Sequence, residues 1–156
     1  MANLDAVRAE LQRFLPSRGW ELKLWRPASW KEAHGGREIT FRDQVDMFHD
    51  VALSIQVHGA ENVNMVWMPA NATHVTVVKC GDTGQLTGMK THAMGFRHKR
   101  TYPANCTVPM PKGFKVNYTI NEESVYYMDV ERDLLPVLSD AMAELERDGV
   151  CRAREL

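Results

Sequence analysis

The sequence predicts an α+β fold, a single two-layer domain in which helices pack on an antiparallel β-sheet of about five to six strands. Helical apolar patterns lie at the N-terminus, in the centre and at the C-terminus, while strand-like segments follow one another through the second half. No repeat, low-complexity tract or linker divides the 156 residues. At this length we expect one domain spanning residues 1–156.

Helical periodicity begins at the N-terminus. Apolar residues recur at helical spacing from Leu4 to Leu11, and Asn3 is a suitable capping residue, so we expect a helix over residues 3–15. A short helix is expected over residues 29–34, because a Ser-x-x-Glu capping box begins it and two glycines follow it.

The central and C-terminal helices show longer apolar stripes. One stripe covers residues 41–55, after a capping residue at Thr40 and before a stop at Gly59. The other covers residues 131–148 and accommodates Pro136 in its first turn. Both segments are predicted to be amphipathic helices packed on the sheet.

Strand signals fill the segments between these helices. They are short apolar or alternating runs bounded by glycine, proline or asparagine. The glycine-rich residues 80–88 lack the Gly-Lys-Ser/Thr ending of a phosphate-binding loop, so we expect a hairpin turn there. The expected strands cover residues 20–26, 63–68, 74–80, 86–98, 113–120 and 124–130.

The charged residues are unevenly distributed although the net charge is only −1. Residues 83–120, here called the basic segment, hold six Lys or Arg and no acidic residue, and aromatic residues are interspersed among them. Cations neutralise phosphates and aromatic rings stack on bases. The β-rich face at about 86–118 is therefore predicted to bind a polyanion, either a nucleic acid, a nucleotide or an acidic protein surface. The candidate anion-binding residues are Lys90, His92, Arg97, His98, Lys99, Arg100, Lys112 and Lys115.

Two other arrangements of the basic segment stay open. Residues 121–156 hold ten acidic residues against four basic ones, so this segment can pack beside the basic one and neutralise it. The aromatic residues can equally belong to the core. A different class of function also stays open, in which apolar and tryptophan-bearing surfaces assemble copies of the chain into a homo-oligomer.

A second candidate site lies on the expected strand 74–80. Residues two apart on a strand project from the same face, so His74 and Thr76 should lie together while Val75 and Val77 face the core. A histidine exchanges protons near neutral pH, and a threonine hydroxyl can donate to a phosphate oxygen. His74 and Thr76 are therefore the candidate catalytic residues, with a purely structural role for His74 as the alternative.

The segment "HVTVV" resembles the strand-borne His-x-Thr motif of the two-histidine phosphodiesterase superfamily. The resemblance implies a metal-independent phosphodiesterase or RNase-like enzyme that uses His74 and Thr76. That superfamily uses two such motifs, and the only echo here, "VNYTI", has Asn117 in the histidine position. Since asparagine cannot transfer a proton, the resemblance implies binding of such a substrate without cleavage.

Several other classes of site are not expected. Cys80, His92, His98 and Cys106 match no zinc-binding spacing, so we expect no metal and no cofactor. No apolar run is long enough to suggest a membrane partner. Three cysteines without a close pair, and an N-terminus unlike a secretory signal, indicate a reducing, cytoplasmic location.

Overall fold

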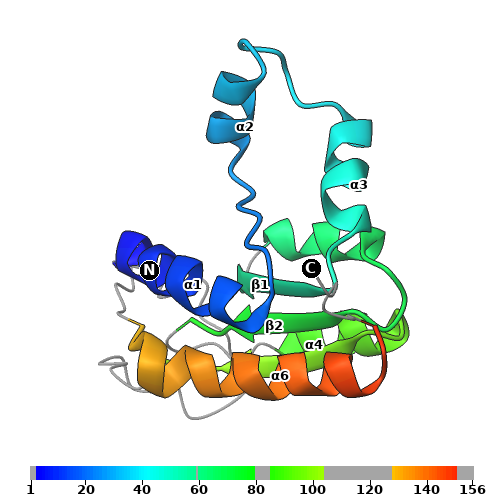
Figure 1. Ribbon diagram of the computed structural model, residues 1–156. Coiled ribbons are helices and arrows are strands. Elements are labelled where there is room, and N and C mark those ends of the chain that lie inside the picture. The colour runs from blue at the N-terminus through cyan, green and yellow to red at the C-terminus, as the bar shows by residue number, and fades with distance from the viewer. Residues whose placement is uncertain (1–2, 59, 80–84, 104–127, 151–156) are drawn as a thin grey trace.

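The computed structural model contains helices on both faces of one small β-sheet (Figure 1). The part of the chain that it describes comprises residues 3–58, 60–79, 85–103 and 128–150. Helices and strands are thus combined in an α+β fold, as expected. In chain order the elements are α1 (Leu4–Phe14), η1 (Pro16–Arg18), α2 (Pro27–Ala33), α3 (Phe41–His49), β1 (Leu53–Val57), η2 (Ala60–Trp67), β2 (Thr73–Val77), α4 (Gln85–Ala93), β3 (Arg97–Thr101), η3 (Val130–Leu134) and α6 (Leu135–Arg147).

The prediction of an antiparallel sheet with five to six strands is wrong. The described residues form three strands in the order β1-β2-β3, and both pairs are parallel. The 3₁₀ segment η2 joins β1 to β2, and the helix α4 joins β2 to β3. Such crossovers return the chain to the edge at which the previous strand began, so the next strand runs in the same direction. Residues 85–88 of the expected hairpin turn instead form the first part of α4, and residues 80–84 lie outside the described residues.

The central strand β2 explains why the sheet is parallel and covered on both faces. All five of its residues are buried, including the polar Thr73, His74 and Thr76. Parallel strands are usually enclosed between helices, and their side chains are buried on both faces. A strand with one solvated face would have exposed the threonine and histidine side chains.

The expected central helix over residues 41–55 is also wrong in its second half. Helix α3 ends at His49, and β1 follows from Leu53. The apolar side chain of Ile55 fits a helical stripe and an alternating strand equally well. This segment forms a strand because β1 pairs with β2 over five residues.

Other expected strands have different structures. Residues 20–26 are an irregular connection, and residues 63–68 lie mostly in the 3₁₀ segment η2. The expected strand 86–98 is helix α4 over most of its length, with β3 beginning only at Arg97. Short apolar runs do not distinguish strand from helix, which is why these predictions failed. The expected strands 113–120 and, except for its last three residues, 124–130 lie outside the described residues.

The N-terminal and C-terminal helices are confirmed. Pro136 lies in the first turn of α6. Backbone N–H groups in a first turn have no partner within the helix, so the missing amide hydrogen of proline costs no hydrogen bond there. Asn3 precedes α1 but does not cap it with its side chain. Its amide group instead forms two hydrogen bonds with the backbone of Met128, donating at 2.8 Å and accepting at 3.1 Å.

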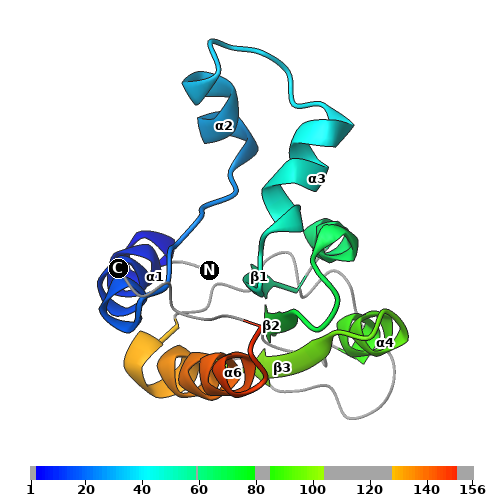
Figure 2. The same ribbon diagram turned by 45° about the vertical axis from the view of Figure 1, so that its right-hand side comes forward.

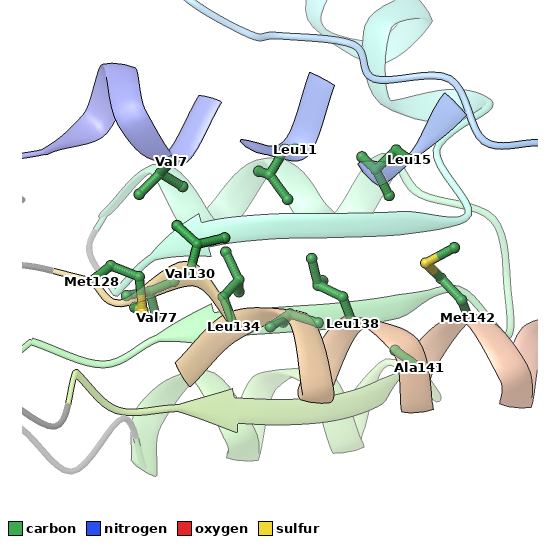
Figure 3. Close-up of a cluster of buried hydrophobic side chains, with 11 residues drawn as sticks. Val7, Leu11, Leu15, Val77, Met128, Val130, Leu134, Leu138, Ala141 and Met142 are labelled. Carbon is green, nitrogen blue, oxygen red and sulfur yellow. The ribbon is translucent and has the colours of Figure 1, made fainter. Parts of the chain in front are cut away.

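The main core lies between one face of the sheet and the helices α1 and α6 (Figure 3). Leu11 of α1 and Leu138 of α6 pack here against Val75 and Val77 of β2. A second cluster, around Phe48, Met65 of η2 and Met68, lies on the α3 side of the molecule. Among the described residues, no helix is both long and apolar enough to cross a membrane.

Candidate ligand-binding face of the sheet

Strand β3 divides the cations of the basic segment between the two faces of the sheet. Side chains alternate along a strand, so Arg97 and Lys99 face α6 while His98 and Arg100 face the opposite side. The side opposite α6 is called the polar face below. It also carries Ser54 of β1, because the register aligns that residue with His74 and His98.

On the α6 side, acidic residues neutralise the two cations. Arg97 forms an ion pair with Asp148, and Lys99 forms one with Asp140. The Lys99 ammonium also lies 2.8 Å from a carboxylate oxygen of Glu144. Burial opposes the charged ammonium, but hydrogen bonds to these two acids outweigh it and raise the pKa of Lys99. The acidic C-terminal segment therefore compensates this half of the basic segment.

The polar face contains two linked pairs of side chains. The Ser54 hydroxyl lies 2.6 Å from Nδ1 of His74, and the Thr76 hydroxyl lies 2.9 Å from Nε2 of His98. The two imidazole rings stack with their centroids 5.9 Å apart and their planes 11° from parallel. A second histidine therefore lies beside His74, but it is His98 on the neighbouring strand, whereas Asn117 lies outside the described residues.

Helix α4 packs on the polar face, where Gly88 lies close to the His98 ring. A Cβ atom added to Gly88 would lie 3.1 Å from Nδ1 of His98, closer than almost all real Cβ contacts. One turn further along, the buried Thr91 donates a hydrogen bond to the Gly88 carbonyl at 2.9 Å. The absence of a side chain at Gly88 lets the helix approach the imidazole ring closely.

Burial and neighbouring positive charges keep these histidines neutral. Burial, followed by the charges of His98 and His58, lowers the pKa of His74 to about 4. Burial, followed by the charges of Arg100 and His58, lowers the pKa of His98. The three strands and α4, as the structure describes them, contain no Asp or Glu. Within these four elements, the charged side chains are therefore all basic.

The two candidate catalytic residues are confined to the interior. His74 and Thr76 share a face, as expected, but both are 0% exposed. Among the described residues, Nε2 of His74 has no hydrogen-bond partner. A neutral imidazole that is buried from solvent fits the structural alternative for His74.

The remaining candidate anion-binding residues lie in different places. Arg100 is exposed on the polar face, while Lys90 and His92 are exposed on α4. Lys112 and Lys115 lie outside the described residues. Beside Arg100, a hollow of about 420 Å³ is open to solvent between β3 and α6. Its lining residues are Lys99, Arg100, Pro136, Val137 and Asp140.

Ser54 and His58 belong to the polar face, although neither residue was expected there from the sequence. Both lie in the segment assigned to the central helix or its stop. The signal was present, because "LSIQVH" alternates apolar and polar residues from Leu53 to His58. That alternation directs the serine and the glutamine away from the core.

No metal centre is formed by the described residues, since no three of their His, Cys, Asp or Glu side chains are arranged to hold an ion. Cys80 and Cys106 lie outside these residues. Comparison of the chain with protein-family models, with curated proteins and with solved structures finds no match.

Proposed function

We propose that the protein binds single-stranded nucleic acid through the surface around Arg100 and Tyr102, at the carboxyl end of β3. The observation that carries this proposal is the position of Arg100 and Tyr102 at the carboxyl end of β3, where both residues are exposed. Arg97 and Lys99 of the same strand lie on the other face of the sheet, where they are paired with acids of α6.

The position of these residues supports the proposal. In parallel sheets flanked by helices, ligands generally bind beyond the carboxyl ends of the strands. Arg100 is the penultimate residue of β3, and Tyr102 follows the strand with 48% of its surface exposed. A guanidinium group binds a phosphate with two parallel hydrogen bonds, and an exposed aromatic ring offers a base a stacking surface.

The charge of Arg100 favours an anionic ligand. Burial is the largest cause of the lowered pKa of His98, and the Arg100 guanidinium is the second; the same positive charge attracts a phosphate. Lys90, exposed on α4, adds positive charge on the helix that covers this face.

Fluorescence anisotropy with a labelled single-stranded oligonucleotide tests the proposal. We expect affinity to fall steeply between about 50 and 200 mM salt, because bound cations release counterions from the phosphates. Arg100→Ala should weaken binding several-fold and reduce the salt slope by about one. Arg97→Ala is the matched control, since it removes the same charge from the opposite face and should leave the slope unchanged.

Competition experiments distinguish a nucleic-acid ligand from an acidic protein partner. Polyglutamate carries negative charge without bases, so it should compete weakly, and Tyr102→Ala should weaken binding to the oligonucleotide only. Competition by polyglutamate as strong as that of the oligonucleotide would indicate an acidic protein partner instead. Absence of binding at low salt, or equal losses in the Arg97 and Arg100 variants, would refute the proposal.

A further inference from the structure

A hollow between β3 and α6 adjoins the residues of the proposed binding surface. Figure 2 shows α6 running beside β3, which is the last strand in the order β1-β2-β3. Lys99 and Arg100 line the hollow from the strand, and Pro136, Val137 and Asp140 line it from the helix. Arg100 belongs to the polar face, and its side chain also reaches the hollow because β3 ends the order of the described strands.

The size and shape of the hollow suit one unit of a longer strand. Its volume of about 420 Å³ lies within the range of roughly 300–1,000 Å³ that is typical of small-molecule sites. Because the hollow is open to solvent, a bound strand can continue beyond the unit that the hollow holds. A single nucleotide of an oligonucleotide can therefore enter it.

The α6 side of the hollow combines apolar side chains with a carboxylate. Pro136 is exposed and Val137 is half-buried, and together they form an apolar wall. Asp140 lies one turn further along the helix, and its side chain is 63% exposed although it forms an ion pair with Lys99. A carboxylate has about four lone-pair sites for hydrogen bonds, so Asp140 can accept further bonds beside its ion pair.

The presence of Asp140 and Arg100 in one hollow restricts the kind of ligand. A carboxylate repels a phosphate, so Asp140 weakens the attraction of this site for a bare phosphate. A ligand that carries a hydroxyl group next to its phosphate satisfies both side chains. In dinucleotide-binding parallel sheets, an Asp or Glu accepts a hydrogen bond from the ribose 2′-hydroxyl. The hollow therefore has the chemistry of a ribonucleotide site.

The ion pair with Lys99 holds the Asp140 carboxylate in position. The Lys99 side chain is only 17% exposed, and its ammonium also lies 2.8 Å from a carboxylate oxygen of Glu144. An ammonium that is bound to two acids has little freedom, so it fixes the acceptor at Asp140. Rigid binding groups lose less entropy when a ligand binds. Glu144 contacts the same ammonium without lining the hollow, as far as the structure describes the chain.

We propose that the hollow holds one ribonucleotide of a bound RNA strand, and that Asp140 selects RNA over DNA by accepting a hydrogen bond from the ribose 2′-hydroxyl. Arg100 binds the neighbouring phosphate, while Pro136 and Val137 cover the apolar edge of the sugar. This inference rests on the proposed binding of single-stranded nucleic acid and names the sugar that the site recognises. DNA lacks the 2′-hydroxyl donor, so it would bring its phosphate beside a carboxylate that receives nothing in return.

Fluorescence anisotropy with RNA, DNA and 2′-fluoro oligonucleotides of one sequence tests the selection. We expect the parent protein to bind RNA about tenfold more tightly than DNA, because DNA cannot form the hydrogen bond to the charged carboxylate. The 2′-fluoro strand keeps an RNA-like sugar without the hydroxyl donor, so it should bind as weakly as DNA. Asp140→Ala should abolish the preference for RNA, while the affinity for DNA stays equal or rises because the repulsion of its phosphate is gone.

Glu144→Ala is the matched control. It also removes one acid from Lys99, but it leaves the residues that line the hollow in place, so it should keep the parent's ratio of RNA to DNA affinity. NMR gives the second measurement: the methyl resonances of Val137 should shift when RNA binds, whereas those of Leu4, exposed on α1, should not.

Several results would overturn this inference. They are equal binding of RNA and DNA by the parent, a preference for RNA that Asp140→Ala leaves intact or that Glu144→Ala removes equally, and Val137 resonances that RNA leaves unchanged. If Arg100→Ala still weakens binding in those cases, the proposed binding of nucleic acid stands without the selection of RNA. If no oligonucleotide binds at low salt, the proposed function fails and this inference fails with it.

Discussion

The imidazole of His74 stacks on that of His98 across two adjacent parallel strands, with ring centroids 5.9 Å apart. Each ring is anchored by a hydroxyl group on a neighbouring strand, Ser54 for His74 and Thr76 for His98. Since positive charge on either ring disfavours charge on the other, the pair is stable when both rings are neutral. This relationship links the stability of the sheet to pH and to ligands.

Acidification should destabilise the protein through His74. Its pKa is about 4 in the fold and 6.5 without the fold, so the unfolded chain binds more protons below pH 6.5. The contribution of neutral His74 is complete above pH 6.5 and is lost as the pH falls towards 4. The expected loss is roughly 2–3 kcal/mol, measured by urea unfolding at several pH values.

Substitution of His74 identifies the source of this pH dependence. His74→Asn should lower stability at pH 7 and remove most of the decrease between pH 6.5 and 4. His92→Asn, on the exposed surface of α4, is the control and should keep the parent's profile. An unchanged profile in the His74 variant would contradict this assignment.

Gly88→Ala should destabilise the protein although alanine favours helices. The new Cβ would lie 3.1 Å from Nδ1 of His98, and Thr76 holds the other ring nitrogen at 2.9 Å, so the ring has little freedom to move. We expect a net loss of about 1 kcal/mol in the free energy of unfolding. In a His98→Ala background the obstacle is gone, and Gly88→Ala should instead stabilise by about 0.5–1 kcal/mol. The same sign in both backgrounds would show that the close approach to His98 is unimportant.

Lys99→Met should destabilise the protein by about 1 kcal/mol at low salt. The Lys99 side chain is only 17% exposed, and its removal leaves Asp140 and Glu144 without their shared cation. Lys90→Met, at an exposed position on α4, serves as the control and should change the free energy of unfolding little. Thermal or urea unfolding of the two variants measures the difference, and equal effects would argue against the pairing with α6.

A bound phosphate should raise the pKa of His98. Burial, Arg100 and His58 lower it in the free protein, and a negative charge beside Arg100 offsets the repulsion from that guanidinium. NMR titration of the His98 ring protons, with and without a saturating oligonucleotide, measures the shift. His49, on α3, reports on any general effect of the ligand. A His98 titration that the oligonucleotide leaves unchanged would place the ligand elsewhere.

The periodicity of apolar residues correctly predicted those helices and strands whose pattern fits only one type of secondary structure. The stripe that begins at Leu4 and the one that ends near Leu145 have full helical periods and clear stops, and both are helices. The alternation at His74 and Thr76 placed both on one face of a strand. By contrast, the stripe through Phe48 and Ile55 fits two periods, and pairing with β2 decided between them.

The sequence by itself determined the α+β composition, the terminal helices, strand β2 and the separation of basic from acidic segments. Only the tertiary structure decided that the sheet is parallel, that His98 is the neighbour of His74, and that Lys99 is paired with the acids of α6. Periodicity is a property of neighbouring residues, so it reports which side chains share a face. Strand direction and partner depend on crossovers and long-range packing, for which a local pattern contains no signal.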